Sequence, residues 1–259
     1  MSPVQATPAS VTNALILRLS LMVFGLSLFF MSAVRADTWS AGAVVTYNQS
    51  EWGDPTNFAG MLMDDNFDAV CASAGGIFEI GSTTPGFFML FTGGGDLGDF
   101  LPTSGLPGPL GADLVNPSSS SAGVFGGEVA ALKLNLDFSN AGLLPNSSGL
   151  LLGDLVLTGF SGSESSLNGL TVEQFFPLSQ AALAGQATSI DFADIDNVTA
   201  NINDAFDVGQ PDSFAQDHLV APSSSAAMPE PPTLLLAAVG VLAAAILTKK
   251  RVLGRPDPI

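Results

Sequence analysis

Short apolar runs separated by turn residues characterise the first half of the chain after residue 37. Residues 77–80 and 87–92 are rich in β-branched and aromatic residues and are bounded by glycine and proline, and residues 39–47 have a similar bias. Runs of this length and composition are typical of strands. We therefore predict short strands over these three ranges, joined by loops that contain glycine and proline.

The second half of the chain carries the three- and four-residue spacing of helices. One apolar set is spaced three, four and four positions apart: Ile195, Val198, Ile202 and Phe206. This spacing places the four residues on one face of an amphipathic helix. Thr171 and Gln174 have the spacing of a capping box, so we expect a second helix to begin there and to kink at Pro177.

Residues 128–138 fit two different periods. Leu132 and Leu136 alternate with polar residues, which favours a strand, but together with Val129 they also fit one face of a helix. The helix propensity of this stretch is high, and we predict a helix here and a short strand over 150–157. The chain is thus expected to have an α+β fold, with short strands in its first half and amphipathic helices in its second half.

The N-terminus has the pattern of a secretory signal. Arg18 precedes an apolar run over 19–31, and residues 34–36 end in a small-residue cleavage pattern. The run is shorter than the roughly 20 residues that a transmembrane helix needs. We therefore predict a signal peptide over 1–36, with a retained N-terminal anchor as the alternative.

A second apolar span lies near the C-terminus. Residues 233–248 contain no charge and follow a flexible Ser/Ala-rich linker over 221–228. A basic cluster comes directly after the span: Lys249, Lys250 and Arg251. As a helix this span would rise about 24 Å, so we predict a short transmembrane helix. Basic residues stay on the cytoplasmic side, which places the tail 252–259 in the cytoplasm and the body of the protein across the membrane.

A Pro-Glu-Pro motif stands directly before this span: Pro229, Glu230 and Pro231. The motif, the short apolar helix and the basic cluster, in this order over 229–251, resemble the PEP-CTERM sorting signal. The resemblance implies processing by an exosortase, a membrane-embedded transpeptidase-like enzyme. It also implies delivery of the body to the cell surface or to an exopolysaccharide matrix. Plain membrane anchoring without processing is the alternative.

The charge of the chain is strongly uneven. It has 24 acidic and 7 basic residues, and residues 37–228 hold 22 of the acids but only Lys133 among the basic residues. Such acidity argues against nucleic-acid binding, which needs a basic surface. The single cysteine, Cys71, excludes an intramolecular disulfide framework. We therefore expect residues 37–220 to form an acidic extracytoplasmic domain.

Part of this domain, residues 85–220, resembles a module of secreted bacterial surface proteins of undetermined function. The shared stretches are 99–102, 121–139 and 203–206. The resemblance supplies no catalytic residue. It implies an exported surface protein and nothing more specific.

Acidic and amide side chains are dense near the end of the domain. Because Ca²⁺ prefers oxygen ligands, one group is a candidate calcium site: Asp191, Asp194, Asp196, Asn197, Asn201 and Asp204. Asp194, Asn197 and Asn201 share a polar face of the predicted helix. A solvated acidic face explains these residues equally simply and is the interpretation we favour, because their spacing matches no EF-hand loop. We expect no other cofactor.

The sequence gives little support for an enzyme. It lacks the nucleophile-elbow, phosphate-loop and zinc-protease motifs, and we expect its one histidine, His218, to be a surface residue. We expect no catalytic residues and a structural or adhesive role in an exopolysaccharide layer. The alternatives are a secreted polysaccharide hydrolase that uses paired carboxylates and an unprocessed single-pass membrane protein.

Overall fold

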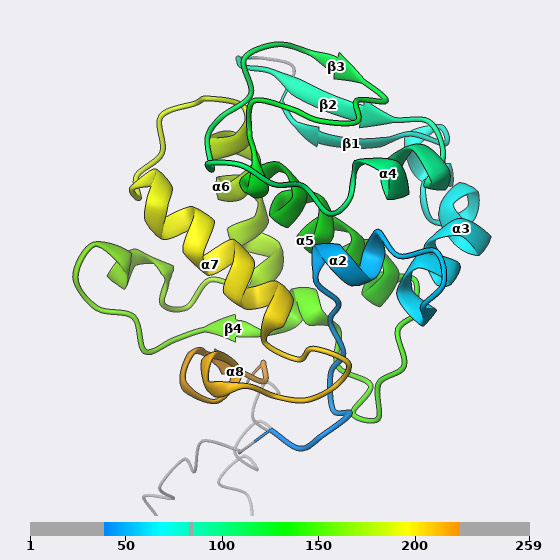
Figure 1. Cartoon of the computed structure of the whole chain (residues 1–259). Coiled ribbons are helices and arrows are strands. Elements are labelled where there is room, and N and C mark those ends of the chain that lie inside the picture. Colours follow the sequence, from blue (N-terminus) through cyan, green and yellow to red (C-terminus); the bar gives the residue numbers. More distant parts are fainter. Residues whose placement is uncertain (1–38, 83–84, 223–259) are drawn as a thin grey trace, which may run out of the picture. The chain divides into compact units, whose positions relative to one another are not determined.

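The computed structural model describes residues 39–82 and 85–222 (Figure 1). The predicted signal peptide, the sorting signal and the C-terminal tail lie outside these residues. The described part combines helices with two small sheets. The fold is therefore α+β, as predicted from the sequence.

Helices occupy both halves of the described part. The α-helices are α2 (Gln49–Trp52), α3 (Phe58–Val70), α4 (Gly94–Phe100), α5 (Val124–Asn140), α6 (Val172–Leu183), α7 (Phe192–Asp204) and α8 (Ser213–His218). Short 3₁₀ segments lie between them: η2 (Ala72–Ala74), η3 (Leu152–Asp154) and η4 (Gly162–Leu167). The strands are β1 (Phe78–Gly81), β2 (Phe88–Phe91), β3 (Leu114–Val115), β4 (Val156–Leu157) and β5 (Leu219–Val220).

The larger sheet has the strand order β1-β2-β3. β1 and β2 pair antiparallel, with Phe78 opposite Phe91 and Ile80 opposite Met89, and β3 pairs parallel with β2. These four side chains are buried, so one face of the sheet packs on the helical core. In Figure 1 the sheet lies across one side of α5. The second sheet is the antiparallel pair of β4 and β5.

Helix α5 runs through the centre of the described part and contacts α2, α6, α7, η3 and β1. Twelve of its 17 residues are buried. A helix that other elements surround is apolar on every side rather than along one stripe. This burial explains why residues 128–138 fit both a strand period and a helix period, and the helix prediction is confirmed.

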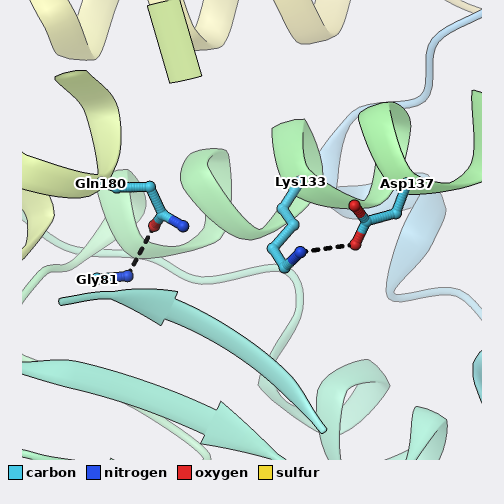
Figure 2. A network of polar contacts seen from close by, with 4 residues as sticks. All are labelled: Gly81, Lys133, Asp137 and Gln180. Carbon is cyan, nitrogen blue, oxygen red and sulfur yellow. Dashed lines mark hydrogen bonds and ion pairs between the residues drawn. The ribbon is translucent and has the colours of Figure 1, made fainter. Parts of the chain in front are cut away.

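Two polar contacts lie where the larger sheet meets α5 and α6 (Figure 2). The Gly81 amide, at the end of β1, donates to Oε1 of Gln180 at 2.7 Å. Lys133 pairs with Asp137 one helical turn further on, at 2.7 Å, and its ammonium lies 5.2 Å from the centre of the Phe78 ring. The Gly81 amide faces the outer edge of β1, away from β2, and Gln180 supplies the acceptor that it needs there.

Both helices predicted in the second half are confirmed. At the start of α6, the backbone amide of Gln174 donates to Thr171 Oγ1 at 3.2 Å, and the backbone amide of Thr171 donates to Oε1 of the Gln174 side chain at 3.0 Å. This is the predicted capping box, and Pro177 lies inside the helix. The apolar face of α7 is buried: Ile195, Val198 and Ile202. The fourth residue predicted on this face, Phe206, is buried too, but it lies in the turn after the helix, which ends at Asp204.

The predicted strand over 39–47 is wrong. This segment turns at Gly42 and runs beside the turn that follows α7, to which it is joined by separate backbone hydrogen bonds. The Thr46 amide donates to the Phe206 carbonyl at 3.0 Å, and the Val208 amide donates to the Thr46 carbonyl at 3.2 Å. Because its neighbour is a turn and not a strand, the pairing stays a single bridge between Thr46 and Asp207. Most apolar residues of this segment are buried in the core although the segment is not a strand.

Two further sequence predictions need correction. Residues 150–157 form a strand only at Val156–Leu157, because η3 (Leu152–Asp154) precedes it. The first half also contains a 13-residue helix, α3, which was not predicted from the sequence because the runs on either side of it resemble strands. Its buried positions Ala59, Met63 and Phe67 are four residues apart, which is the spacing of a helix face.

Candidate functional site

The predicted sorting residues lie outside the described part of the chain: Pro229, Glu230, Pro231, Lys249, Lys250 and Arg251. The apolar span 233–248 lies outside it as well. Within residues 39–82 and 85–222, no helix combines the length and the apolarity needed to cross a membrane. The sorting signal therefore stays a prediction from the sequence.

The six candidate calcium ligands lie on α7 or at its N-cap, Asp191. Two side-chain hydrogen bonds involve them: Ser163 Oγ donates to Asp194 Oδ2 at 2.9 Å, and Asn201 Nδ2 donates to Asn197 Oδ1 at 3.3 Å. Among the residues that the structure describes, no three His, Cys, Asp or Glu side chains are arranged to hold a metal ion. A calcium site stays a prediction, and its amide members belong to a pocket described below.

The other two candidates are Asp196, which is half-buried, and Asp204, which is exposed but partly shielded from solvent. Burial raises the pKa of Asp196. Burial and the nearby charges of Asp207 and Asp212 raise the pKa of Asp204. Both groups are thus more costly to ionise in the folded protein than in water, because burial and like charges disfavour the ionised form.

A buried amide network joins α5 to α7 and to the segment before α2. Asn135 Oδ1 accepts hydrogen bonds from the Tyr47 amide at 2.9 Å and from Trp52 Nε1 at 3.3 Å. Its Nδ2 donates to the Tyr47 carbonyl at 2.8 Å and to Asn203 Oδ1 at 3.1 Å. Neither asparagine is exposed to solvent. Asn135 therefore uses its full hydrogen-bonding capacity inside the core.

The network continues from Asn203 to a carboxylate on α5. Asn203 Nδ2 donates to Glu128 Oε2 at 2.8 Å, and Gln49 Nε2 donates to Glu128 Oε1 at 2.7 Å. Gln49 Oε1 in turn accepts from the Thr103 amide at 2.8 Å. Burial raises the pKa of Glu128, although the hydrogen bonds from Asn203 and Gln49 oppose the rise. These bonds connect α2, α5, α7 and the loop after α4.

Gly127 gives Gln49 the space that this network needs. A Cβ atom at position 127 would lie 2.0 Å from Gln49 Oε1 and 2.4 Å from Thr103 Oγ1. Both distances are far shorter than a van der Waals contact. Any side chain at this helix position would therefore displace Gln49 from Glu128 and Thr103.

A pair of carboxyl groups lies beside the network, where α2 meets the turn after α7. Burial raises the pKa of Glu51 from 4.5 to about 7, and the neighbouring Asp207 side chain adds to the rise, while the hydrogen bond from the Asn48 amide lowers it. The Oδ1 atom of Asp207 is buried and has no hydrogen-bond partner among the described residues. When Glu51 is protonated, its carboxyl O–H can donate a hydrogen bond to Asp207, and this favours the protonated form of Glu51.

A pocket of about 160 Å³ opens between η4, α7 and α8. Three of its lining residues carry aromatic rings that contact one another. The ring centre of His218 lies 4.5 Å from that of Phe160 and 5.0 Å from that of Phe214. His218 Nδ1 lies 3.0 Å from the Thr158 carbonyl oxygen, and because a carbonyl only accepts, Nδ1 carries the hydrogen. His218 is therefore a half-buried residue whose ring packs against two phenylalanines.

Besides Gly159 and Val198, the other lining residues of this pocket are polar. They come from η4, its preceding loop and α7: Ser161, Glu164, Asn197 and Asn201. They supply a hydroxyl, a carboxylate and two amides, and the described part of the chain contributes no lysine or arginine to the lining. The lining thus combines aromatic rings with polar groups and carries one carboxylate.

Hydrogen bonds on both flanks hold the pocket in shape. Asn168 accepts from the Phe160 amide and donates to the Phe160 carbonyl, each at 2.9 Å, and this closes the η4 loop on itself. Ser163 ties that loop to Asp194 on α7. At Gly159, whose φ is +75°, a Cβ atom would lie 2.8 Å from the Asp217 carbonyl oxygen. The pocket is thus largely formed without a ligand.

A larger open pocket of about 390 Å³ contains Cys71, Lys133 and Asp137. Cys71 is buried. Burial, with the nearby charge of Asp137, raises the pKa of its thiol to about 11. Since only the thiolate is an effective nucleophile, Cys71 is a core residue and not a reactive group.

The grouping of three aromatic rings at the His218 pocket was not predicted from the sequence, because the rings come from two separate segments. One signal was present: Phe214 and His218 are four residues apart on α8, so they lie on the same helix face. Phe160 gives no such signal before the fold is known. No known protein family matches the chain, and neither does any curated protein or solved structure.

Proposed function

We propose that this chain is the precursor of an exported acidic surface protein, which an exosortase-type enzyme processes within its C-terminal sorting signal. The observation that carries the proposal is the fixed order of Pro229-Glu230-Pro231, the uncharged span 233–248 and the basic cluster after it. Three unlike features in this order form a specific pattern. The mature protein would then act as a structural or adhesive component of an exopolysaccharide layer.

The charge of the described part supports a role in a matrix whose contacts divalent cations mediate. Its one lysine, Lys133, pairs with Asp137, so the remaining carboxylates there have no lysine or arginine to neutralise them. Such a surface repels anionic polymers unless divalent cations bridge the two. We therefore propose that association with an anionic matrix depends on calcium.

The sorting proposal is tested by changing the motif and following the protein. Glu230→Gln should leave the full-length chain in the membrane fraction, whereas the wild-type protein appears on the cell surface in a shortened form. Asp257→Asn, beyond the basic cluster, is the matched control and should behave as the wild type. If Glu230→Gln is sorted and shortened normally, the motif is not a processing signal and the proposal is wrong.

A secreted polysaccharide hydrolase is the second candidate function. The observation in its favour is the raised pKa of Glu51 within the Glu51–Asp207 pair, because a glycosidase needs a general acid whose pKa is raised. The two side chains are hydrogen-bonded, which is closer than the roughly 5–9.5 Å between the carboxyl groups of glycosidases, so the second carboxylate of such a site would be a different residue. Activity of the chain on a panel of polysaccharides, lost in Glu51→Gln but kept in Glu79→Gln, would establish this function. Retained activity in Glu51→Gln would exclude the pair as its catalytic site.

A further inference from the structure

We propose that the His218 pocket binds a single uncharged sugar residue, either free or as one unit of a polysaccharide. The inference goes beyond the sorting proposal and does not depend on it, since every residue of the pocket lies between positions 159 and 218. It assigns a ligand class to a pocket whose residues come from three separate segments of the chain.

The lining matches the two kinds of surface that a sugar presents. A pyranose ring has apolar C–H faces and a rim of hydroxyl groups. The lining residues Phe160, Phe214 and His218 supply aromatic carbon, against which a C–H face can pack. The lining also includes Asn197 and Asn201, whose amides both donate and accept, as hydroxyl groups do. Glu164 adds an acceptor for a hydroxyl hydrogen.

The charge of the pocket selects against anionic ligands. Glu164 is the one ionisable lining group besides His218, and the described chain carries a single lysine, Lys133, which lines the other pocket with Cys71. A phosphate or a uronic-acid carboxylate would meet a negative wall without a cationic partner. A neutral hydroxyl-rich ligand avoids this repulsion and still satisfies the amides.

The size and the preformed shape of the pocket limit the ligand to one sugar unit. Its volume of about 160 Å³ is well below the roughly 300–1,000 Å³ of pockets that enclose drug-sized molecules. Because Asn168 and Ser163 already fix the η4 loop, little ordering accompanies binding. A small ligand in an open pocket binds weakly, and we expect a dissociation constant on the order of 1 mM.

His218 is the only histidine of the chain, so its ring resonances report on this pocket without assignment of the spectrum. The experiment uses the full chain with isotope-labelled histidine, in a detergent that has no sugar headgroup. Methyl glucoside, methyl galactoside and methyl mannoside are titrated into it, with methyl glucuronide as the anionic comparison. We expect a saturable shift of the His218 resonance with at least one neutral glycoside and at least tenfold weaker binding of the glucuronide.

Two variants tie the shift to the pocket wall. Asn201→Ala should weaken binding at least fivefold, and Glu164→Ala, on a different element, provides a second test if Asn201→Ala does not fold. Asn66→Ala on α3, whose side chain bonds only to the Leu62 carbonyl of its own helix, is the control and should bind as the wild type.

The inference is overturned if none of the neutral glycosides gives a saturable shift, if the glucuronide binds as well as they do, or if the folded pocket variants bind like Asn66→Ala. These results are independent of sorting. A chain that binds glucoside but is never processed would refute the sorting proposal alone. A processed chain with no shift would refute this inference alone.

Discussion

Asn135 on α5 donates a hydrogen bond to Asn203 on α7 across 3.1 Å, at a position where neither side chain reaches solvent. A buried amide is tolerated only when its hydrogen bonds are made. Asn135 makes four, to Tyr47, Trp52 and Asn203. Because the partners come from three parts of the chain, this one residue fixes how α5, α7 and the segment before α2 fit together.

Replacing Asn135 should therefore cost far more than replacing a surface asparagine. Asn135→Ala leaves the Tyr47 backbone, Trp52 Nε1 and Asn203 without their partner, and each unpaired buried group costs about 1–3 kcal/mol. We expect the free energy of unfolding to fall by about 3 kcal/mol or more, measured by denaturation followed through tryptophan fluorescence. Asn66→Ala should cost less than about 1 kcal/mol. A similar loss in the two variants would mean that the network does not stabilise the fold.

Gly127 provides a test in which helix propensity and packing act in opposite directions. In a helix, Gly→Ala normally stabilises by about 1 kcal/mol, but here the added Cβ would lie 2.0 Å from Gln49 Oε1. Gly127→Ala should therefore destabilise the protein by about 2 kcal/mol. Gly95→Ala is the matched control, because a Cβ at that position in α4 meets no atom within 4 Å, and this variant should be neutral or slightly stabilised. Stabilisation by Gly127→Ala would contradict the packing seen around Gln49.

The raised pKa of Glu51 predicts a stability that falls as the pH rises. The folded protein holds the Glu51 proton with a pKa of about 7, against the usual 4.5. The folded state thus binds more protons than the unfolded state between these values, and the free energy of unfolding decreases with pH across this window. The raised pKa values of Glu128, Asp196 and Asp204 act in the same direction.

Thermal unfolding of the wild type and of Glu51→Gln between pH 5 and pH 8 measures this effect. The wild-type melting temperature should fall across this range, and the fall should be smaller in Glu51→Gln, whose amide imitates the protonated group. Glu79→Gln, an exposed carboxylate on β1, should follow the wild type. Parallel curves for the wild type and Glu51→Gln would show that Glu51 is not the group responsible.

Calcium should control association with anionic polymers and leave sugar binding in the pocket unchanged. The two effects separate because bridging joins exposed carboxylates to an anionic polymer, whereas the proposed sugar is uncharged and needs no bridging cation. In co-sedimentation, the protein should pellet with an acidic polysaccharide in the presence of calcium and be released by a chelator. If the protein still pellets with the polysaccharide after the chelator is added, calcium does not mediate the association.

The parts of the fold that follow from local chemistry could be predicted from the sequence. The capping box of Thr171 and Gln174 concerns two residues three positions apart, and the structure has it as expected. The prediction failed where the partner is distant. Nothing in residues 39–47 indicates that their neighbour is a turn near Phe206 and not a strand.

The candidate sites show the same division. Asn135 and Asn203 look like polar helix residues in the sequence, and only tertiary packing places them together in the core. Asn197 and Asn201 share a helix face, as the sequence indicated, but the rings that line the same pocket come from the loop after β4 and from α8. Charge and terminal motifs need no fold to be recognised, which is why the sequence supports an account of sorting more readily than one of binding.

The intact mass of the protein extracted from the cell surface tests the central claim most directly. The account predicts a chain that begins after Ala36 and has lost everything beyond about Pro231, including the apolar span and Lys249, Lys250 and Arg251. A mass that still includes the chain through to Ile259 would contradict it, because the C-terminal segment would then be a permanent anchor.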